Sequence, residues 1–173
     1  MEKVKISQDF LYQYLQEHGM NISLLGKYMG VSEGILRGSF NHSLNRHGKP
    51  MKFSDANIKR LNAAIAQVAA ELPQMIVQFG SEQTFTNKRG TAYDPAAAVA
   101  IKKLKPYFKI NQLTSRVLGW NQVKTRFIFS APSSNIFEQI TAGDVQRINA
   151  EILSVAGVLS NFEVVSDEKT VGS

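Results

Sequence analysis

Apolar side chains recur at the spacing of an α-helix through most of the chain. At positions 10, 11, 14 and 15 they predict a helix that begins after Ser7 and ends at Gly19. Two short helices are predicted next: Asn21 or Ser23 caps the first, and Ser32 caps the second. This pattern predicts an all-α fold.

The most regular apolar stripes belong to two longer helices. The first begins at the cap Ser54 and ends or kinks at Pro73, and its apolar side is formed by Ile58, Leu61, Ile65, Val68 and Leu72. The second begins at the cap Thr141, and its apolar side is formed by Val145, Ile148, Ile152, Val155 and Leu159. Between them, Asp94-Pro95 begins a further helix that continues until Pro106 stops it.

The two long helices belong to an internal repeat. Residues 51–72 align with residues 138–159 at an offset of 87, and residues 20–31 align with residues 109–120 at an offset of 89. The two-residue difference between the offsets belongs in a loop. Identical pairs include Arg60 with Arg147, Asn62 with Asn149, Ile65 with Ile152 and Leu72 with Leu159. A repeat of this kind indicates one supersecondary unit used twice.

The repeat predicts two tandem helical domains. We expect the first in residues 1–80, a linker in residues 81–93, the second domain in residues 94–161 and a tail in residues 162–173. The linker has many turn-forming residues and no periodicity. Within the tail, Phe162, Val164 and Val165 offer local packing.

The composition limits the expected cellular location and the class of binding partner. The chain carries a net charge of +6 and no cysteine, which excludes disulfides and thiolate metal sites. No apolar run reaches about 18 residues, and the start lacks the apolar stretch of a signal peptide, so we expect no membrane partner and a bacterial cytoplasm, for a cellular or a phage protein. Basic residues gather between Arg37 and Arg60 and between Lys88 and Arg126, which favours a polyanion partner.

The short helices on either side of Gly30 form the motif that indicates a function. Gly30 can take a positive φ without steric cost, and Gly26 is small enough to let the two helix backbones approach closely. The expected buried contacts are Leu25, Met29, Val31 and Leu36. Two short helices that cross steeply expose the outer face of the second one, which suits a helix that enters a major groove.

These residues resemble a known family of DNA-binding domains. Gly26, Gly30-Val31-Ser32-Glu33-Gly34 and Leu36-Arg37 resemble the helix-turn-helix of lambda-repressor-like (XRE-type) domains. Lys49-Pro50 and Phe53-Ser54-Asp55-Ala56-Asn57-Ile58 resemble the loop and fourth helix of that family. The resemblance implies sequence-specific binding of duplex DNA by two tandem helix-turn-helix domains, as in a transcriptional regulator or a DNA-binding factor of a phage or mobile element.

The second copy departs from the family pattern. It keeps Ser115 at the small position, Gly119 at the turn, and Leu118 and Trp120 as expected core. Thr125, however, stands where the first copy has a leucine, and Phe127 falls where the second helix should be exposed. Either this helix is rotated, or the copy has become a packing or dimer surface.

The resemblance assigns candidate contacts to the polar residues of both copies. The candidates for base contact are Ser32, Glu33, Arg37 and Asn41 in the first copy and Asn121, Gln122, Lys124 and Arg126 in the second. Arginine can take guanine O6 and N7 together, and asparagine can do the same for adenine. The candidates for phosphate contact are His42, Asn45, Arg46, His47, Lys49, Lys52, Lys88, Arg89, Lys109 and Arg116.

Other chemistry has little support in the sequence. His42 and His47 stand in a flexible, glycine-containing loop with no acidic ligand nearby, so no metal site is predicted. No Ser-His-acid or paired-carboxylate grouping is present, so we predict neither an enzyme nor a cofactor. The alternative to DNA binding is a helical interaction module, an adaptor or virion component, that meets a second copy or another protein through the second domain.

Overall fold

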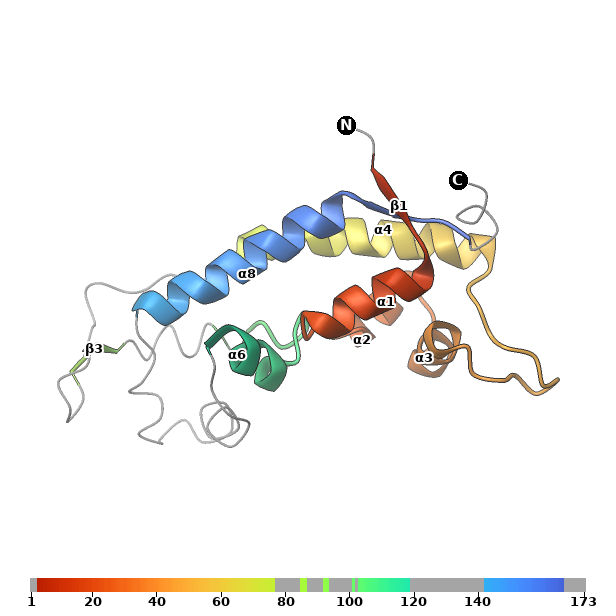
Figure 1. Ribbon diagram of the computed structural model, residues 1–173, viewed down its shortest axis with the longest axis horizontal. Coiled ribbons are helices and arrows are strands. Elements are labelled where there is room, and N and C mark those ends of the chain that lie inside the picture. Colours follow the sequence, from red (N-terminus) through yellow and green to blue (C-terminus); the bar gives the residue numbers. More distant parts are fainter. Residues whose placement is uncertain are drawn as a thin grey trace.

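The computed structural model describes residues 3–76, 85–86, 92–93, 101, 103–118 and 142–166. Over these residues the chain is mostly helical and carries two short two-stranded sheets (Figure 1). The predominance of helix confirms the coarse prediction. The strands show that the all-α expectation was too simple.

The first half contains most of the predicted elements. In chain order they are β1 (Val4–Ile6), α1 (Gln8–Glu17), α2 (Ser23–Met29), α3 (Glu33–Asn41), α4 (Asp55–Glu71) and the 3-10 helix η1 (Leu72–Met75). The hydroxyl groups of Ser7, Ser32 and Ser54 each accept a hydrogen bond from the backbone N–H three residues later, at the starts of α1, α3 and α4. These caps confirm the three predicted helix starts.

The second half repeats part of this pattern. Its elements are β2 (Phe85–Thr86), β3 (Ala92–Tyr93), α6 (Ile110–Leu118), α8 (Ala142–Ser160) and β4 (Phe162–Val164). β2 pairs with β3 in an antiparallel sheet inside the predicted linker, so that segment is not wholly irregular. Residues 103–107 form turns, and the predicted helix therefore ends before Lys105 instead of at Pro106. Its first residues, 94–100, lie outside the described part of the chain.

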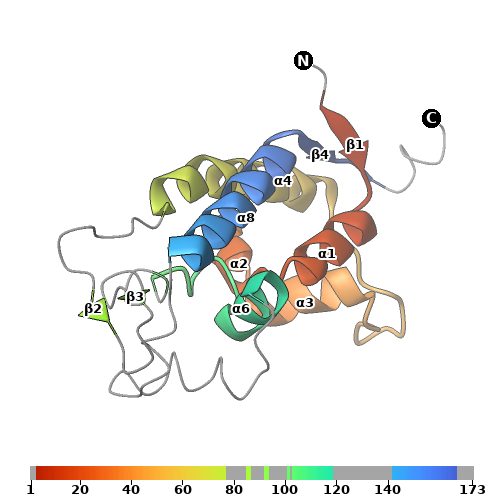
Figure 2. The ribbon, with the colours of Figure 1, turned by 60° about the vertical axis from the view of Figure 1, so that its left-hand side comes forward.

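The long helices of the repeat pack on one another. α4 and α8 lie side by side, α2 packs against α4, and α6 packs against α8 (Figures 1 and 2). The buried side chains between them include the repeat-equivalent pairs Leu61 and Ile148, Ile65 and Ile152, and Val68 and Val155. One hydrophobic cluster therefore contains residues of both halves. The exact domain boundaries stay a prediction.

The segment expected to be a tail contributes a strand. β4 pairs in parallel with β1, with Val4 opposite Phe162 and Ile6 opposite Val164. The side chain of Asn62 on α4 accepts from the Val164 N–H at 2.7 Å and donates to the Val164 carbonyl at 2.9 Å. The two ends of the described chain are thus joined to each other and to α4. The packing of this segment is with the N-terminal strand, not local.

Candidate nucleic-acid interface

A left-handed glycine turn joins α2 to α3. Gly30 has φ 74° and ψ 26°, and its N–H donates to carbonyls of the last turn of α2. A Cβ at Gly26 would lie 3.3 Å from Cδ2 of Leu36, so the two helices approach closely at this glycine. Leu25, Met29 and Leu36 are buried. The predicted helix, glycine turn and second helix are therefore present in the first half.

The outer face of α3 carries the predicted base-contact residues of the first copy. Ser32, Glu33 and Asn41 are exposed, and the Arg37 side chain is 43% exposed. The opposite face of α3 is buried and holds the helix to the core through Leu36, Ser39 and Phe40. Glu33, Arg37 and Asn41 are four residues apart and thus share one accessible helix face, whereas Ser32 caps the start of the helix and its hydroxyl accepts from the Ile35 N–H.

Arg37 is held by an acid one turn earlier. Oε1 of Glu33 lies 2.7 Å from Nη2 and 2.9 Å from Nε of Arg37, and it also accepts from the Ser23 hydroxyl at 3.0 Å. The hydrogen bond from Arg37, followed by that from Ser23, lowers the pKa of Glu33 below its ordinary value. Glu33 occupies the edge of the guanidinium formed by Nε and one N–H of Nη2. The second N–H of Nη2 and the adjacent N–H of Nη1 form the outer edge, which points away from Glu33.

Residues 43–51 form an ordered hairpin, which we call the basic hairpin. Its ends are joined by the Met51 N–H to the Ser43 carbonyl, and its middle by the Asn45 N–H to the Lys49 carbonyl, each at 2.8 Å. The Asn45 side chain accepts from the N–H groups of His47 and Lys49, and Gly48 takes φ 74°. The glycine-containing connection therefore folds into a hydrogen-bonded turn, and its flexibility stays a prediction.

The basic hairpin presents its charges beyond the end of α3. Arg46, His47 and Lys49 are exposed at its tip, and Lys52 is exposed just after it. The hairpin projects from the helices at one end of the molecule (Figure 1). The base-contact face of α3 and these predicted phosphate contacts are therefore consecutive in the chain and neighbours in space.

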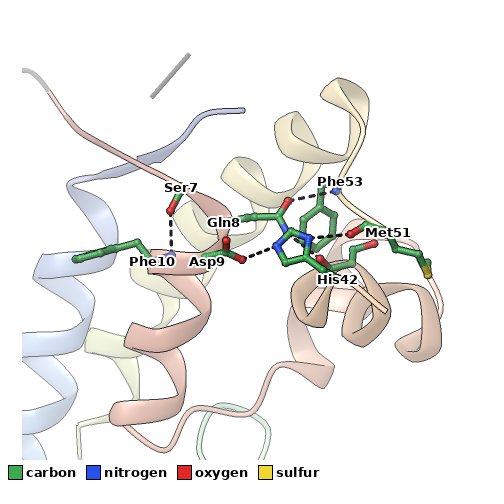
Figure 3. A network of polar contacts seen from close by, with 8 residues as sticks. Ser7, Gln8, Asp9, Phe10, His42, Met51 and Phe53 are labelled. Carbon is green, nitrogen blue, oxygen red and sulfur yellow. Dashed lines mark hydrogen bonds and ion pairs between the residues drawn. The ribbon is translucent and has the colours of Figure 1, made fainter. Parts of the chain in front are cut away.

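His42 joins the end of α3 to α1. It adopts the left-handed backbone conformation, with φ 54°, at the C-terminus of α3. One ring nitrogen, Nδ1, lies 3.0 Å from the Met51 carbonyl, and the other, Nε2, lies 2.7 Å from Oδ1 of Asp9 (Figure 3). The ring is thus engaged by the protein on both sides, although the sequence predicted it as a phosphate contact.

The basic candidates of the second half are less clearly grouped. Lys109 and Arg116 are exposed. The Arg116 guanidinium pairs with Glu151 on α8, whose carboxylate also lies 2.6 Å from Nδ1 of His18. The remaining candidates lie outside the described residues, and they are Lys88, Arg89, Asn121, Gln122, Lys124 and Arg126. Whether the second copy forms a comparable face stays a prediction.

Sequence reasoning missed two residues of this interface. Asp9 stood out in no pattern, because an acid in the first turn of a helix has an ordinary role opposite the helix dipole. The sequence predicts Ser23 only as a helix cap, whereas its hydroxyl donates to Glu33 across the turn. Both contacts join residues of different helices, and no local sequence motif predicts them.

No protein-family model, no curated protein and no solved structure matches this chain. Among the described residues, no group of three or more metal-binding side chains is assembled. Each helix in the same ranges is too short or too polar to span a lipid bilayer. The geometry of α2, α3 and the basic hairpin is therefore the basis for inferring a function.

Proposed function

We propose that this chain binds duplex DNA and that α3 is the element that enters the major groove. The observation that carries the proposal is that the exposed polar residues of α3 are followed directly by an exposed basic hairpin, which projects from the same end of the molecule (Figure 1). An α-helix with its side chains is about 10–12 Å across, which matches a major groove about 12 Å wide. The resemblance to lambda-repressor-like domains supports the same assignment.

Arg37 is the proposed base-reading residue. Its contact with Glu33 fixes the guanidinium plane and leaves the Nη1 and Nη2 edge open. That edge presents two parallel N–H groups, the arrangement that guanine O6 and N7 accept. Glu33 also neutralises part of the charge of Arg37, and its own position suits acceptance from the N4 amine of a neighbouring cytosine.

The basic hairpin supplies the proposed phosphate contacts. Arg46, Lys49 and Lys52 are exposed, and none of them is placed on the face of α3 that would read bases. Contacts of this kind set position and affinity without reading sequence. Each neutralised phosphate releases counterions, so binding should weaken linearly in the logarithm of salt concentration, with a slope near −0.9 per contact.

A salt titration tests the proposal. Fluorescence anisotropy with a mixed-sequence duplex should give binding at low salt, and Arg46→Ala/Lys49→Ala/Lys52→Ala should reduce the magnitude of the salt slope by about 2 to 3. The matched control is Lys3→Ala/Lys5→Ala/Lys27→Ala, which removes the same charge from exposed positions outside both basic clusters. An equal reduction of the salt slope in both triple variants would mean that binding depends only on net charge. Absence of binding at low salt rejects the proposal.

A second candidate, a helical protein-interaction module, rests on exposed apolar side chains of α3 and the basic hairpin. Ile35 on α3 is 46% exposed and Leu44 in the basic hairpin is 68% exposed. Such side chains fit a protein partner, although they also fit thymine methyl groups. Sedimentation of the chain without DNA discriminates the two. Self-association that Leu44→Ser abolishes, together with no binding of duplex, favours the interaction module.

A further inference from the structure

We propose that His42 is a positioning residue that holds the basic hairpin against α1 through a ring protonated on both nitrogens. The effect on DNA binding rests on the proposed function. The protonation of the ring does not, and it can be measured without DNA.

The two partners of the ring both accept hydrogen bonds. Oδ1 of Asp9 belongs to a carboxylate, which when ionised only accepts, and the Met51 oxygen belongs to a backbone carbonyl. A neutral imidazole has one N–H and therefore donates to only one of them. Both distances, 2.7 Å to Asp9 and 3.0 Å to Met51, are those of hydrogen bonds. The imidazolium is the form that satisfies both.

The surroundings of the ring supply a charge that favours this form. From α1 the ring is faced by the Asp9 carboxylate, and from the end of the basic hairpin by the neutral Met51 carbonyl (Figure 3). Next to Asp9, the Gln8 side chain donates to the Ser39 carbonyl at 2.7 Å and accepts from the Phe53 N–H at 3.3 Å. These contacts fix the first turn of α1 against α3 and the chain before α4. The backbone that carries Asp9 is therefore held in place, while the Asp9 side chain itself is 58% exposed.

The backbone conformation of His42 is consistent with a structural role for its ring. The residue stands in the left-handed region, where glycine or asparagine is the usual choice at a helix C-terminus. Histidine tolerates that region less well than glycine does. The two hydrogen bonds of the ring offset part of this cost.

The position of His42 explains how protonation of its ring affects the proposed DNA-binding surface. The residue precedes Ser43, where the basic hairpin begins, and its ring contacts Met51, where the hairpin ends. Loss of a proton removes one of the two bonds and frees the base of the hairpin from either α1 or Met51. The internal bonds of the hairpin and the bond from the Ser43 N–H to the Gly38 carbonyl of α3 remain, but the hairpin loses one of its attachments, and Arg46 and Lys49 are positioned less firmly. The contribution to affinity is present at low pH and is lost as pH rises through the titration of the ring.

The pH profile of duplex binding tests the inference. His47, at the hairpin tip, also gains charge at low pH, so His47→Asn is the reference and His47→Asn/His42→Asn is the test variant. Asn is chosen because it tolerates the left-handed backbone at 42. Between about pH 5.5 and pH 8.5 the reference should weaken on the order of fivefold, and the double variant should not change. Equal pH dependence in the two proteins overturns the inference.

Ring NMR gives a second, DNA-free measurement. The nitrogen shifts of His42 in the full chain should show both nitrogens protonated near pH 7, and Asp9→Asn should move deprotonation to lower pH. A ring that is neutral near pH 7 in the wild-type chain overturns the inference, whatever the binding data show. If the wild-type chain binds no duplex at any pH, the proposed function fails, and the ring spectrum alone decides the role of His42.

Discussion

The same substitution at two neighbouring glycines should have opposite effects on stability. Gly30 has φ 74°, and a Cβ added there would have no heavy atom within 4 Å. Gly30→Ala therefore creates no clash and tests only the left-handed backbone. Gly34 lies in the first turn of α3, and a Cβ added there also meets nothing within 4 Å. Gly34→Ala consequently tests only helix propensity.

The magnitudes follow from the two backbone conformations. A left-handed alanine costs roughly 1–2 kcal/mol, and the smaller entropy of the unfolded chain returns about 0.4–1 kcal/mol, so Gly30→Ala should destabilise by about 1 kcal/mol. Gly34→Ala should stabilise by up to about 1 kcal/mol, because alanine is the better helix former. For a chain of this size the two melting temperatures should differ by roughly 4–8 °C.

Denaturant and thermal unfolding of the two variants provide the measurement. Equal m-values are required, because they show that the unfolded states are comparable. Gly30→Asn is the control, since Asn accepts the left-handed region and should lose less stability than Ala. If Gly30→Ala is as stable as Gly34→Ala, Gly30 does not form the left-handed turn, and the proposed orientation of α3 loses its basis.

Three further predictions concern single contacts. Ser32→Ala removes the cap of α3 and should lower the free energy of unfolding by about 1 kcal/mol, measured by denaturant unfolding. Asn62→Leu leaves the N–H and carbonyl of Val164 unpaired, so it should cost roughly 2–4 kcal/mol and speed hydrogen exchange at Val164; unchanged exchange would contradict the assigned bonds. Arg37 lowers the pKa of Glu33, so the stabilisation from the Glu33–Arg37 ion pair is present above the ordinary carboxyl pKa and is lost as pH falls through the lowered pKa. Arg37→Ala should raise the pKa of Glu33 in an NMR titration.

Local interactions account for the part of the fold that the sequence predicted. Ser7, Ser32 and Ser54 each bond to a backbone N–H three residues away, so the information that starts the helix lies within one turn. Gly30 was predictable for the same reason, because the requirement for a positive φ belongs to one residue. The accessible face of α3 followed from these starting points.

The contacts that were missed join residues far apart in the chain. β1 and β4 are three residues each, and they pair across more than 150 positions, so neither could show a useful pattern by itself. The sequence predicts His42 as a phosphate contact, because no local pattern shows that its partner Asp9 on another helix lies beside it. The repeat identified the apolar faces of α4 and α8 correctly. It did not reveal that these faces meet each other, because equivalence between two units says nothing about the interface between them.

This shared interface changes how the halves should be tested. Dividing the chain into its two halves, for example after Asn87 in the predicted linker, would expose the apolar faces that α4 and α8 bury against each other. A fragment that fails to bind DNA would then report misfolding, not the role of the missing half. Point substitutions in the full chain are the sounder approach.

A binding selection on random duplex DNA tests the central claim, that α3 reads base edges, most directly. The wild-type chain should enrich one sequence motif that contains a guanine read by Arg37. Arg37→Ala should relax the motif at that position, whereas Arg46→Ala should weaken binding to all sequences and keep the motif. Enrichment of no motif, or the same motif from wild type and Arg37→Ala, would contradict the account.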